Sequence, residues 1–419
     1  AAAVYGGAGT DSLVVVGALT SATVWGGSTT ATSTDGADTI YVSGTASASQ
    51  INGNAGNDTV TLVGDLLAGS VLQGGQGNDQ VTLIGNMTSS TLTGNSGNDT
   101  ILVQGTVSAA TVYGGSATDT SGDGADSIFI SGSISKAFVQ GNAGADSVVI
   151  TSSAVSSSLR GGADNDFISV GSTLSASDVN GNKGSDTLAF GSIAAATVYG
   201  GSATDTTNDG ADSIYVTGGA TSAFVQGNAG SDTLAFGGAL SASTVVGGAD
   251  GDLITVTGGI TSSSISGGEG SDTIYSNPGS GTLSQTTVFG GNSSGTSTGD
   301  DSIVLGYASL VASTVYGGAG NDTLSIGTGA VNIHQGNRIN SFDGADSLVV
   351  IGALQETVAD AGAGNDTFFF NASAASINVD ASFIAGAGAD FVTGSQIWGG
   401  TVWGDTSADD TAGGNDTIY

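Results

Sequence analysis

Short alternations of apolar and polar residues recur along the chain at a spacing close to 20 residues. In one such stretch, Leu188 and Phe190 alternate with smaller residues, which predicts a short strand with one buried face. Val198 marks a second, returning strand, and Ile193 between them is expected to plug the connecting turn with an apolar side chain. The same pattern at Val60/Leu62 and Leu324/Ile326 shows that this unit repeats.

A fixed period of this length predicts stacked coils rather than separate globular domains. We therefore expect an all-β fold, a parallel β-solenoid of about nineteen coils of about 20 residues, with two short strands per coil. Residues 1–419 are expected to form one continuous solenoid, either a segment of a longer chain or a filament-forming unit with uncapped ends.

Glycine-rich turns separate the coils, and each ends in an aspartate that precedes the next strand. Clean copies of the six-residue turn are Gly53–Asp58, Gly94–Asp99 and Gly317–Asp322. The nineteen aspartates at this position are Asp11, Asp38, Asp58, Asp79, Asp99, Asp126, Asp146, Asp166, Asp186, Asp212, Asp232, Asp252, Asp272, Asp301, Asp322, Asp346, Asp366, Asp390 and Asp416.

The charge balance limits the partners that the chain can have. With 37 acidic residues against four lysines and arginines, the net charge of −33 excludes nucleic acid and disfavours anionic membranes. The chain has no cysteine, and no apolar stretch is long enough for a spanning helix. Apolar residues make up 38% of the chain, so a continuous core can form once the acids are neutralised.

Stacking places successive turn aspartates about 4.8 Å apart, the spacing of neighbouring strands. At an effective dielectric constant near 20, each adjacent pair would repel by about 3.5 kcal/mol, and many such pairs exceed the stability of an ordinary fold. A cation between successive carboxylates removes this repulsion. The donors on offer are carboxylates and glycine carbonyls, which suit Ca²⁺ better than Mg²⁺, zinc or copper.

The turn sequence Gly-Gly-x-Gly-x-Asp-x-(apolar)-x resembles the calcium-binding nonapeptide of the RTX, or haemolysin-type, repeat proteins. The resemblance covers essentially the whole chain. It implies a right-handed parallel β-roll, an extracellular bacterial location and type I secretion, and it implies that each turn aspartate bridges Ca²⁺ ions above and below it.

This chain carries the motif at only one end of each coil, whereas the family carries it at both. We therefore expect a single file of Ca²⁺ along one edge and a dry, apolar-plugged opposite edge. Loops at 163–166 and 249–252 add a further carboxylate, and Asp119 and Asp123 are candidate additional ligands. Two loops depart from the motif, because Ala361 and Ala385 replace the first glycine.

On about every fourth coil the glycine turn is enlarged by an insertion. The regular set of enlarged turns is 27–38, 115–126, 201–212 and 291–301, and the turns 336–346 and 404–416 break the rhythm. An aromatic residue precedes the glycines of each regular enlarged turn, at Trp25, Tyr113, Tyr199 and Phe289. These rings either pack under their own loops or form a row that binds sugar or a neighbouring molecule.

No catalytic constellation is present, since the single histidine, His334, has no nucleophile or base to pair with and is expected in a solvated loop. We expect a structural, non-enzymatic protein of the bacterial surface: part of a surface layer (S-layer), a filament or an adhesin stalk. Its expected partners are copies of itself and cell-surface polysaccharide.

Eight outward apolar strand residues could support lateral association: Val14, Tyr41, Leu102, Phe129, Tyr215, Val304, Val349 and Phe369. The alternative is a repeat module of a larger type I-secreted toxin or hydrolase. Ice binding is disfavoured, because the third turn position varies among residues such as Ala55, Gln76 and Glu269 instead of being uniformly threonine.

Overall fold

The computed structural model covers residues 1–419 and divides into two compact units, Ala1–Asp212 and Ser213–Tyr419, which we describe separately. The described residues are all those outside the following positions: 1, 28–34, 117–121, 203–207, 277–280, 293–296, 308, 328–331, 335, 352, 355, 372–380, 395–399 and 406–413. Every regular element in the described residues is a β-strand.

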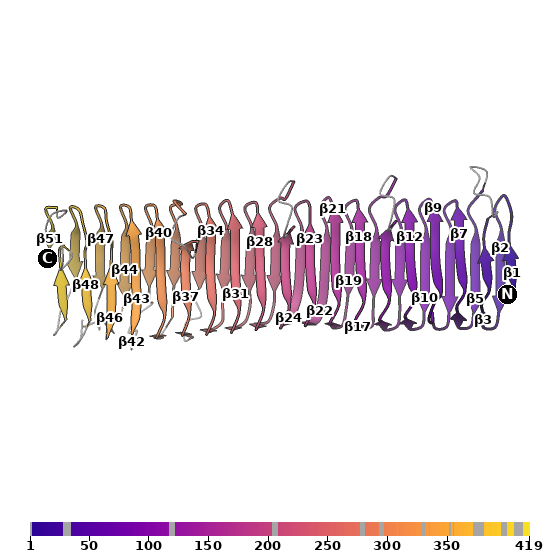
Figure 1. Ribbon diagram of the computed structural model, residues 1–419, viewed down its shortest axis with the longest axis horizontal. Coiled ribbons are helices and arrows are strands. Elements are labelled where there is room, and N and C mark those ends of the chain that lie inside the picture. Colours follow the sequence, from indigo (N-terminus) through magenta and orange to yellow (C-terminus); the bar gives the residue numbers. More distant parts are fainter. Residues whose placement is uncertain are drawn as a thin grey trace. The chain divides into compact units, whose positions relative to one another are not determined.

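Each coil of the first unit contains an outgoing strand, which follows the turn aspartate, and a return strand, which leads to the next glycine turn (Figure 1). The outgoing strands are β2 (Ser12–Val16), β5 (Thr39–Ser43), β8 (Thr59–Val63), β10 (Gln80–Ile84), β13 (Thr100–Val103), β16 (Ser127–Ile130), β19 (Ser147–Ile150), β22 (Phe167–Ser175) and β24 (Thr187–Ala194). The return strands are β1 (Ala3–Tyr5), β4 (Thr23–Trp25), β7 (Gln50–Ala55), β9 (Val71–Gln76), β12 (Thr91–Ser96), β15 (Thr111–Gly115), β18 (Phe138–Ala143), β21 (Ser158–Ala163), β23 (Asp178–Asn182) and β25 (Thr197–Gly201).

The second unit repeats this arrangement. Its outgoing strands are β26 (Ser213–Val216), β29 (Thr233–Phe236), β32 (Leu253–Val256), β35 (Thr273–Ser276), β38 (Ser302–Leu305), β41 (Thr323–Ile326), β44 (Ser347–Ile351), β47 (Thr367–Asn371), β49 (Phe391–Gly394) and β51 (Thr417–Ile418). Its return strands are β28 (Phe224–Ala229), β31 (Thr244–Ala249), β34 (Ser264–Glu269), β37 (Thr287–Gly291), β40 (Thr314–Ala319), β43 (Asn337–Asp343), β46 (Thr357–Asp360), β48 (Ser382–Ile384) and β50 (Thr401–Trp403).

A third, shorter strand lies in the turn opposite the glycine turn, where the sequence predicts only a plugged connection. In the first unit these strands are β3 (Leu19–Thr20), β6 (Ala46–Ser47), β11 (Met87–Thr88), β14 (Val107–Ser108), β17 (Ile134–Ser135) and β20 (Ala154–Val155). In the second unit they are β27 (Ala220–Thr221), β30 (Leu240–Ser241), β33 (Ile260–Thr261), β36 (Thr282–Ser284), β39 (Ser309–Val311), β42 (Asn332–His334) and β45 (Ala353–Leu354). His334, expected in a loop, is therefore the last residue of a strand.

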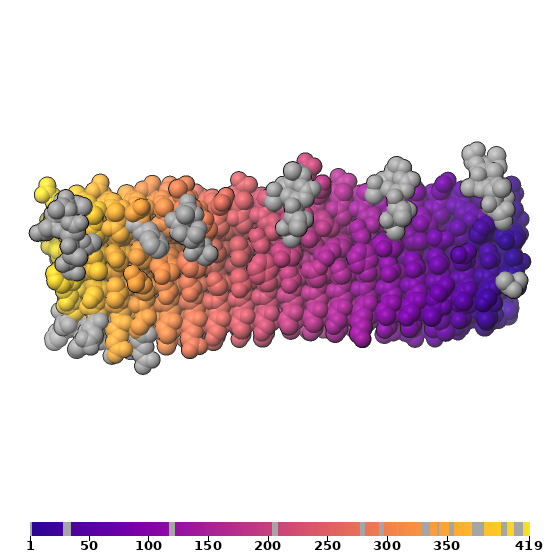
Figure 2. Space-filling model, in the orientation of Figure 1, coloured from indigo at the N-terminus to yellow at the C-terminus, as the bar shows by residue number. Residues whose placement is uncertain are grey.

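Within each unit, the strands pair in parallel with the equivalent strands of neighbouring coils. In the first unit Val81 pairs with Ile101, and in the second Leu234 pairs with Ile254. These inward residues are almost completely buried, so equivalent side chains of successive coils form continuous apolar ladders. On the face shown in Figure 2, the described atoms of each unit pack closely from one coil to the next.

The predicted fold class is confirmed: the chain is an all-β parallel β-solenoid with two sheets and about 17 turns of about 20 residues. The number of turns is smaller than the nineteen coils expected, because that expectation counted one complete coil for each aspartate, whereas nineteen aspartates delimit at most eighteen intervals. None of the described residues forms a helix long and apolar enough to cross a membrane.

Candidate calcium-binding turns

The turn aspartates form a hydrogen-bonded ladder in each unit. The backbone N–H of Asp79 donates to Oδ1 of Asp99 in the next coil, at 2.7 Å. The N–H of Asp252 likewise donates to Oδ1 of Asp272 at 2.8 Å in the second unit. Each carboxylate therefore satisfies a backbone donor of the preceding coil, and this bond fixes the orientation of the carboxyl group.

The second carboxylate oxygen, Oδ2, has no hydrogen-bond partner in almost every turn of the ladder. From Asp38 to Asp390 the ladder residues are at most 3% exposed. Buried Oδ2 atoms without a partner occur in Asp11, Asp38, Asp58, Asp79, Asp99, Asp126, Asp146, Asp166, Asp186, Asp212, Asp232, Asp252, Asp272, Asp301, Asp322, Asp346, Asp366 and Asp390. A column of buried acceptors without donors is costly, so these oxygens require a proton or a cation.

In the turns that begin with glycine, this first glycine leaves the space into which Oδ2 points. A Cβ atom at Gly74 would lie 2.5 Å from Asp79 Oδ2 and 2.8 Å from the carbonyl oxygen of Gly94 in the next coil. At Gly114 the equivalent distances to Asp126 Oδ2 and the Gly141 carbonyl oxygen are 2.6 and 2.8 Å. The backbone φ angle at neither glycine is positive, so glycine is needed here for space and not for conformational freedom.

Burial of the ladder strongly favours the protonated carboxyl groups when no metal is bound. Burial raises the pKa of Asp126 to about 9, and repulsion from Asp146, Asp99 and Asp123 adds to the effect, while the backbone hydrogen bond from Asp99 opposes it. Burial likewise raises the pKa of Asp252 to about 8. At neutral pH, ionisation of these buried carboxyl groups is therefore costly. A bound divalent cation would stabilise the ionised carboxylates and remove this cost.

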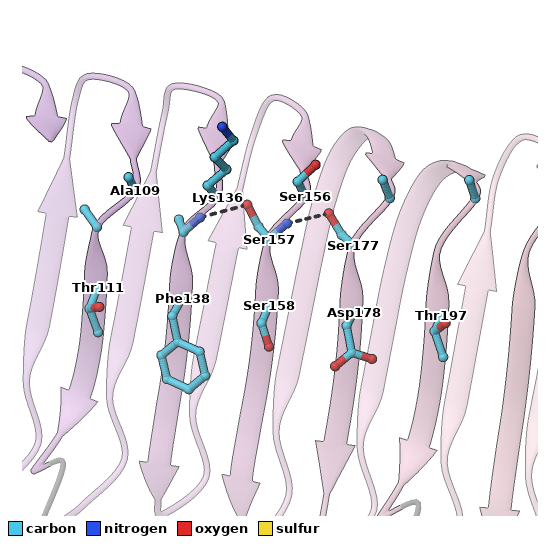
Figure 3. Close-up of a pocket in the computed structure, with 14 residues that line it drawn as sticks. Ala109, Thr111, Lys136, Phe138, Ser156, Ser157, Ser158, Ser177, Asp178 and Thr197 are labelled. Carbon is cyan, nitrogen blue, oxygen red and sulfur yellow. Dashed lines mark hydrogen bonds between the residues drawn. The ribbon is translucent and has the colours of Figure 1, made fainter. Parts of the chain in front are cut away.

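The opposite turn performs the same task with a neutral side chain. The N–H of Ala137 donates to Ser157 Oγ, and the N–H of Ser157 donates to Ser177 Oγ, as the dashed lines in Figure 3 show. The hydroxyl groups of Ser157 and Ser177 in turn donate to carbonyl oxygens of Val155 and Ser175. A hydroxyl both accepts and donates, so neither serine leaves an atom without a partner, and this edge needs no cation.

This serine ladder was not predicted. The opposite edge is plugged by apolar residues such as Ile134, as expected, but it is neither free of acids, since Asp65 and Glu356 lie in two of its turns, nor purely apolar, since it contains buried hydroxyl groups. The signal in the sequence is a Ser or Thr two residues before the inward residue of the return strand, as at Ser49, Ser243 and Ser313.

The donor set of the glycine turn fits Ca²⁺. Oδ2 and the glycine carbonyl oxygen of the next coil are both hard oxygen donors and lie on either side of the same space. Within the described parts of the chain, no three His, Cys, Asp or Glu side chains come together in a way that could hold a metal. Each ion would therefore depend on backbone carbonyls as well as on the one carboxylate that each turn supplies.

The other predicted ligand residues have different outcomes. Asp123 lies against Gly115 in its enlarged turn, where its carboxylate accepts bonds from the N–H groups of Gly124 and Ala143. Asp164, in the loop 163–166, adopts a positive φ of 75° in place of the usual glycine. Asp119 lies outside the described residues, and the role of the nineteen ladder aspartates as calcium ligands stays a prediction.

The aromatic residues that precede the enlarged turns pack against aromatic residues of neighbouring coils. Trp25 lies edge-on to Tyr5 at 5.6 Å between ring centroids, and Phe289 stacks on Tyr316 at 5.0 Å. All four marker residues, Trp25, Tyr113, Tyr199 and Phe289, are half-buried, so each remains partly accessible to solvent. The two interpretations of this aromatic set therefore both remain open.

Comparison with known proteins supports the calcium interpretation. The model of the RTX calcium-binding nonapeptide repeat matches four segments, residues 32–62, 84–103, 246–283 and 312–330. The chain thus carries RTX calcium-binding repeats, and the ladder continues through turns that the sequence model does not match, such as that of Asp166.

Among solved structures, the chain is similar to a hyperactive, Ca²⁺-dependent, β-helical antifreeze protein from an Antarctic bacterium. The two share 22% sequence identity over 75% of this chain and 83% of the other, with a TM-score of 0.48. No curated protein matches the sequence.

The raised pKa values predict how the stability of the metal-free protein depends on pH. Asp58, Asp126 and Asp252 have folded-state pKa values of about 6, 9 and 8 against about 3.9 in an unfolded chain, so the folded state binds more protons between these limits. Their contribution to stability is complete below about pH 4 and is lost as the pH rises through 6 to 9.

Thermal unfolding of protein freed of metal on a chelating resin, followed by circular dichroism, should give a higher melting temperature at pH 5 than at pH 8. Saturating calcium should reverse this order, because the ion binds the deprotonated carboxylate. A metal-free protein that is more stable at pH 8 would contradict the assignment of the buried charge.

Replacement of a single ladder residue should separate the two roles of the carboxylate. In Asp99→Asn, Oδ1 still accepts the N–H of Asp79, while the amide nitrogen replaces the Oδ2 atom that has no partner. We expect the metal-free protein to gain about 1–3 kcal/mol in unfolding free energy and the calcium-loaded protein to bind fewer ions. Denaturant titration measures the unfolding free energy, and isothermal titration calorimetry counts the bound calcium ions.

The matched control is Asp65→Asn, because Asp65 also accepts a backbone N–H, from Asn86, but lies outside the ladder. It should change neither quantity. Loss of metal-free stability in Asp99→Asn would show that the Oδ2 atom is not the source of the cost.

Proposed function

We propose that this calcium-binding RTX-repeat solenoid is a structural protein of the bacterial exterior, which Ca²⁺ holds rigid as part of a surface layer, a filament or an adhesin stalk. The observation that carries the proposal is the ladder of buried carboxylates, which continues from coil to coil in each unit. Calcium then acts as a structural cross-link in every coil, and binding free energy becomes folding free energy. RTX repeats also suggest a secreted bacterial protein, and type I secretion is the route we propose.

A row of exposed apolar side chains on the outgoing strands favours association with further copies of the chain. Val14 and Tyr41 are paired neighbours in the first unit and are 66% and 39% exposed. Phe129 is 38% exposed and lies between Leu102 and Val149, which are half-buried. Phe369 continues the pattern in the second unit at 43% exposure. Such a row on a sheet face favours lateral packing.

The non-enzymatic role is part of the same proposal. The alternative, a repeat module of a larger type I-secreted toxin or hydrolase, requires a catalytic domain in addition to these coils. Both share the calcium-dependent solenoid, and they differ in whether the solenoid itself associates.

Calcium titration with imaging tests the proposal. Metal-free protein at neutral pH should gain β-structure by circular dichroism as calcium is added, and electron microscopy should then show filaments or ordered arrays. Complete β-structure in excess chelator would rule out the calcium cross-link. Calcium-loaded protein that stays monomeric would favour the module over the assembling protein.

The variant Phe129→Thr provides a matched control for association, because Thr61 and Thr82 already occupy the same outward row. It should fold with unchanged calcium dependence and show weaker assembly.

A second candidate function, binding of neutral polysaccharide, is favoured by two equivalent grooves on the return strands. In the first unit a groove over three coils is lined by side chains such as Asn52, Gln73 and Asn95 and reaches Ser116, the first residue after the glycines of an enlarged turn. In the second unit a groove at the equivalent position is lined by side chains such as Gln226 and Ser266 and reaches Asn292. Amides and hydroxyls without a basic residue suit uncharged sugar hydroxyls.

Binding of neutral bacterial polysaccharides, measured by glycan array and isothermal titration in calcium buffer, tests this second function. The variant Gln73→Leu should weaken binding about tenfold, because it removes an amide from the groove floor. Thr82→Leu on the opposite sheet serves as the control. Equal binding by both variants would place the sugar elsewhere.

A further inference from the structure

The four regular enlarged turns have glycine at the second turn position, although the backbone there does not require it. In ordinary turns this position has a positive φ angle, such as 132° at Gly75 and 80° at Asn54, which explains the choice of glycine or asparagine. None of the equivalent residues in the regular enlarged turns has a positive φ: Gly27, Gly115, Gly201 and Gly291. Glycine in these turns therefore serves to leave space.

An oxygen-bearing side chain from the end of the insertion lies against this glycine. In three turns it is the first aspartate of an Asp-Gly-Ala-Asp sequence, whose last aspartate belongs to the ladder: Asp35, Asp123 and Asp209. A Cβ atom on the second glycine of each turn would overlap with the carboxylate of this aspartate. In the fourth turn Ser297 takes its place, with Oγ 3.4 Å from the Cβ position of Gly291.

The turn 291–301 shows that this side chain and the ladder carboxylate border the same space. The Cβ position of Gly291 lies 3.4 Å from Ser297 Oγ and 3.6 Å from Asp301 Oδ2. Ser297 is 6% exposed and Asp301 is 3% exposed, and neither of these two oxygens has a hydrogen-bond partner. Two buried oxygens without partners beside one space indicate a ligand that both can bind, and a cation meets this requirement.

Asp123 has the capacity and the position for the same role. Each of its carboxylate oxygens accepts one backbone N–H, from Gly124 at 3.3 Å and from Ala143 at 3.2 Å, and retains further lone pairs. Burial raises the pKa of Asp99 and of Asp146 to about 7, and repulsion from Asp123 adds to the rise in both. The Asp123 carboxylate therefore lies near the ladder on both sides of its own coil, where a further negative charge is costly unless a cation binds there.

We propose that the regular enlarged turns bind calcium more tightly than the ordinary turns, because the insertion adds one side-chain ligand to the ladder carboxylate of each: Asp35, Asp123, Asp209 and Ser297. Calcium affinity rises with the number and the charge of the oxygen ligands, and a second carboxylate increases both. The three aspartate turns are accordingly the tightest, and the serine turn gains one neutral ligand. This inference rests on the proposed calcium-held solenoid and adds an order of filling to it, in which the enlarged turns bind their ions first.

Competition with a fluorescent calcium chelator of known affinity, on the metal-free full-length chain, tests this order. The wild type should show two classes of site, with the enlarged turns in the tighter class. Asp123→Asn keeps the shape of the side chain and one acceptor oxygen but removes the charge, so one ion should bind about tenfold more weakly while the total number of ions stays the same. In the opposite direction, Ser297→Asp should tighten the binding of one ion by about the same factor.

The matched control is Asp164→Asn. Asp164 is also an extra carboxylate close to a ladder aspartate, but it belongs to an ordinary turn, is exposed and has a positive φ of 75°, which asparagine adopts readily. The same loss of charge at this exposed position should change no calcium affinity by more than about twofold.

The outcomes separate this inference from the proposed function. If the wild type binds calcium in a single class, or if Asp123→Asn and Asp164→Asn weaken binding equally, the inference is wrong and the calcium-held solenoid stands. If the wild type binds no calcium, the proposed function fails and the inference fails with it. Should Asp123→Asn not fold by circular dichroism, Ser297→Asp decides, and an unchanged affinity there overturns the inference.

Discussion

The coil depends on one constraint: the backbone N–H that ends each glycine turn has no acceptor within its own coil. The carboxylate of the next aspartate meets this need, as Asp99 does for Asp79. A carboxylate has two oxygens and no hydrogen, so one bond leaves the other oxygen buried without a donor. The empty space at the first glycine, the raised pKa values and the requirement for a cation all follow from this arrangement.

The two edges of each coil solve the same problem with different chemistry. On the opposite turn, Ser157 accepts the N–H of Ala137 and passes its own hydrogen to a carbonyl oxygen, so the edge is complete without help from solution. On the glycine turn, the second carboxylate oxygen finds a partner only when a proton or a cation binds there. The stability of the serine edge therefore does not depend on ions in solution, whereas the stability of the glycine-turn edge depends on calcium and pH.

The periodic features of the fold could be predicted from the sequence, and the features carried by ordinary residues could not. Aspartate after glycine at a constant spacing is conspicuous, so the ladder and the apolar plug of the opposite turn were both accessible. The serine ladder was missed because Ser49 and its equivalents stand among many other serines and carry no charge. Nor did the sequence indicate that Ala109 and Lys136, in the opposite turn, adopt the left-handed conformation that glycine usually provides.

The ladder also has a direction. Each ladder carboxylate accepts a hydrogen bond from the backbone N–H of the preceding coil. The backbone N–H of the same residue donates to the carboxylate of the following coil. A chain that leaves the ribosome from its N-terminus therefore always has one unfinished coil at its growing end, which the next 20 or so residues close. Order of synthesis and order of bonding coincide, so the solenoid can be laid down coil by coil without waiting for its far end.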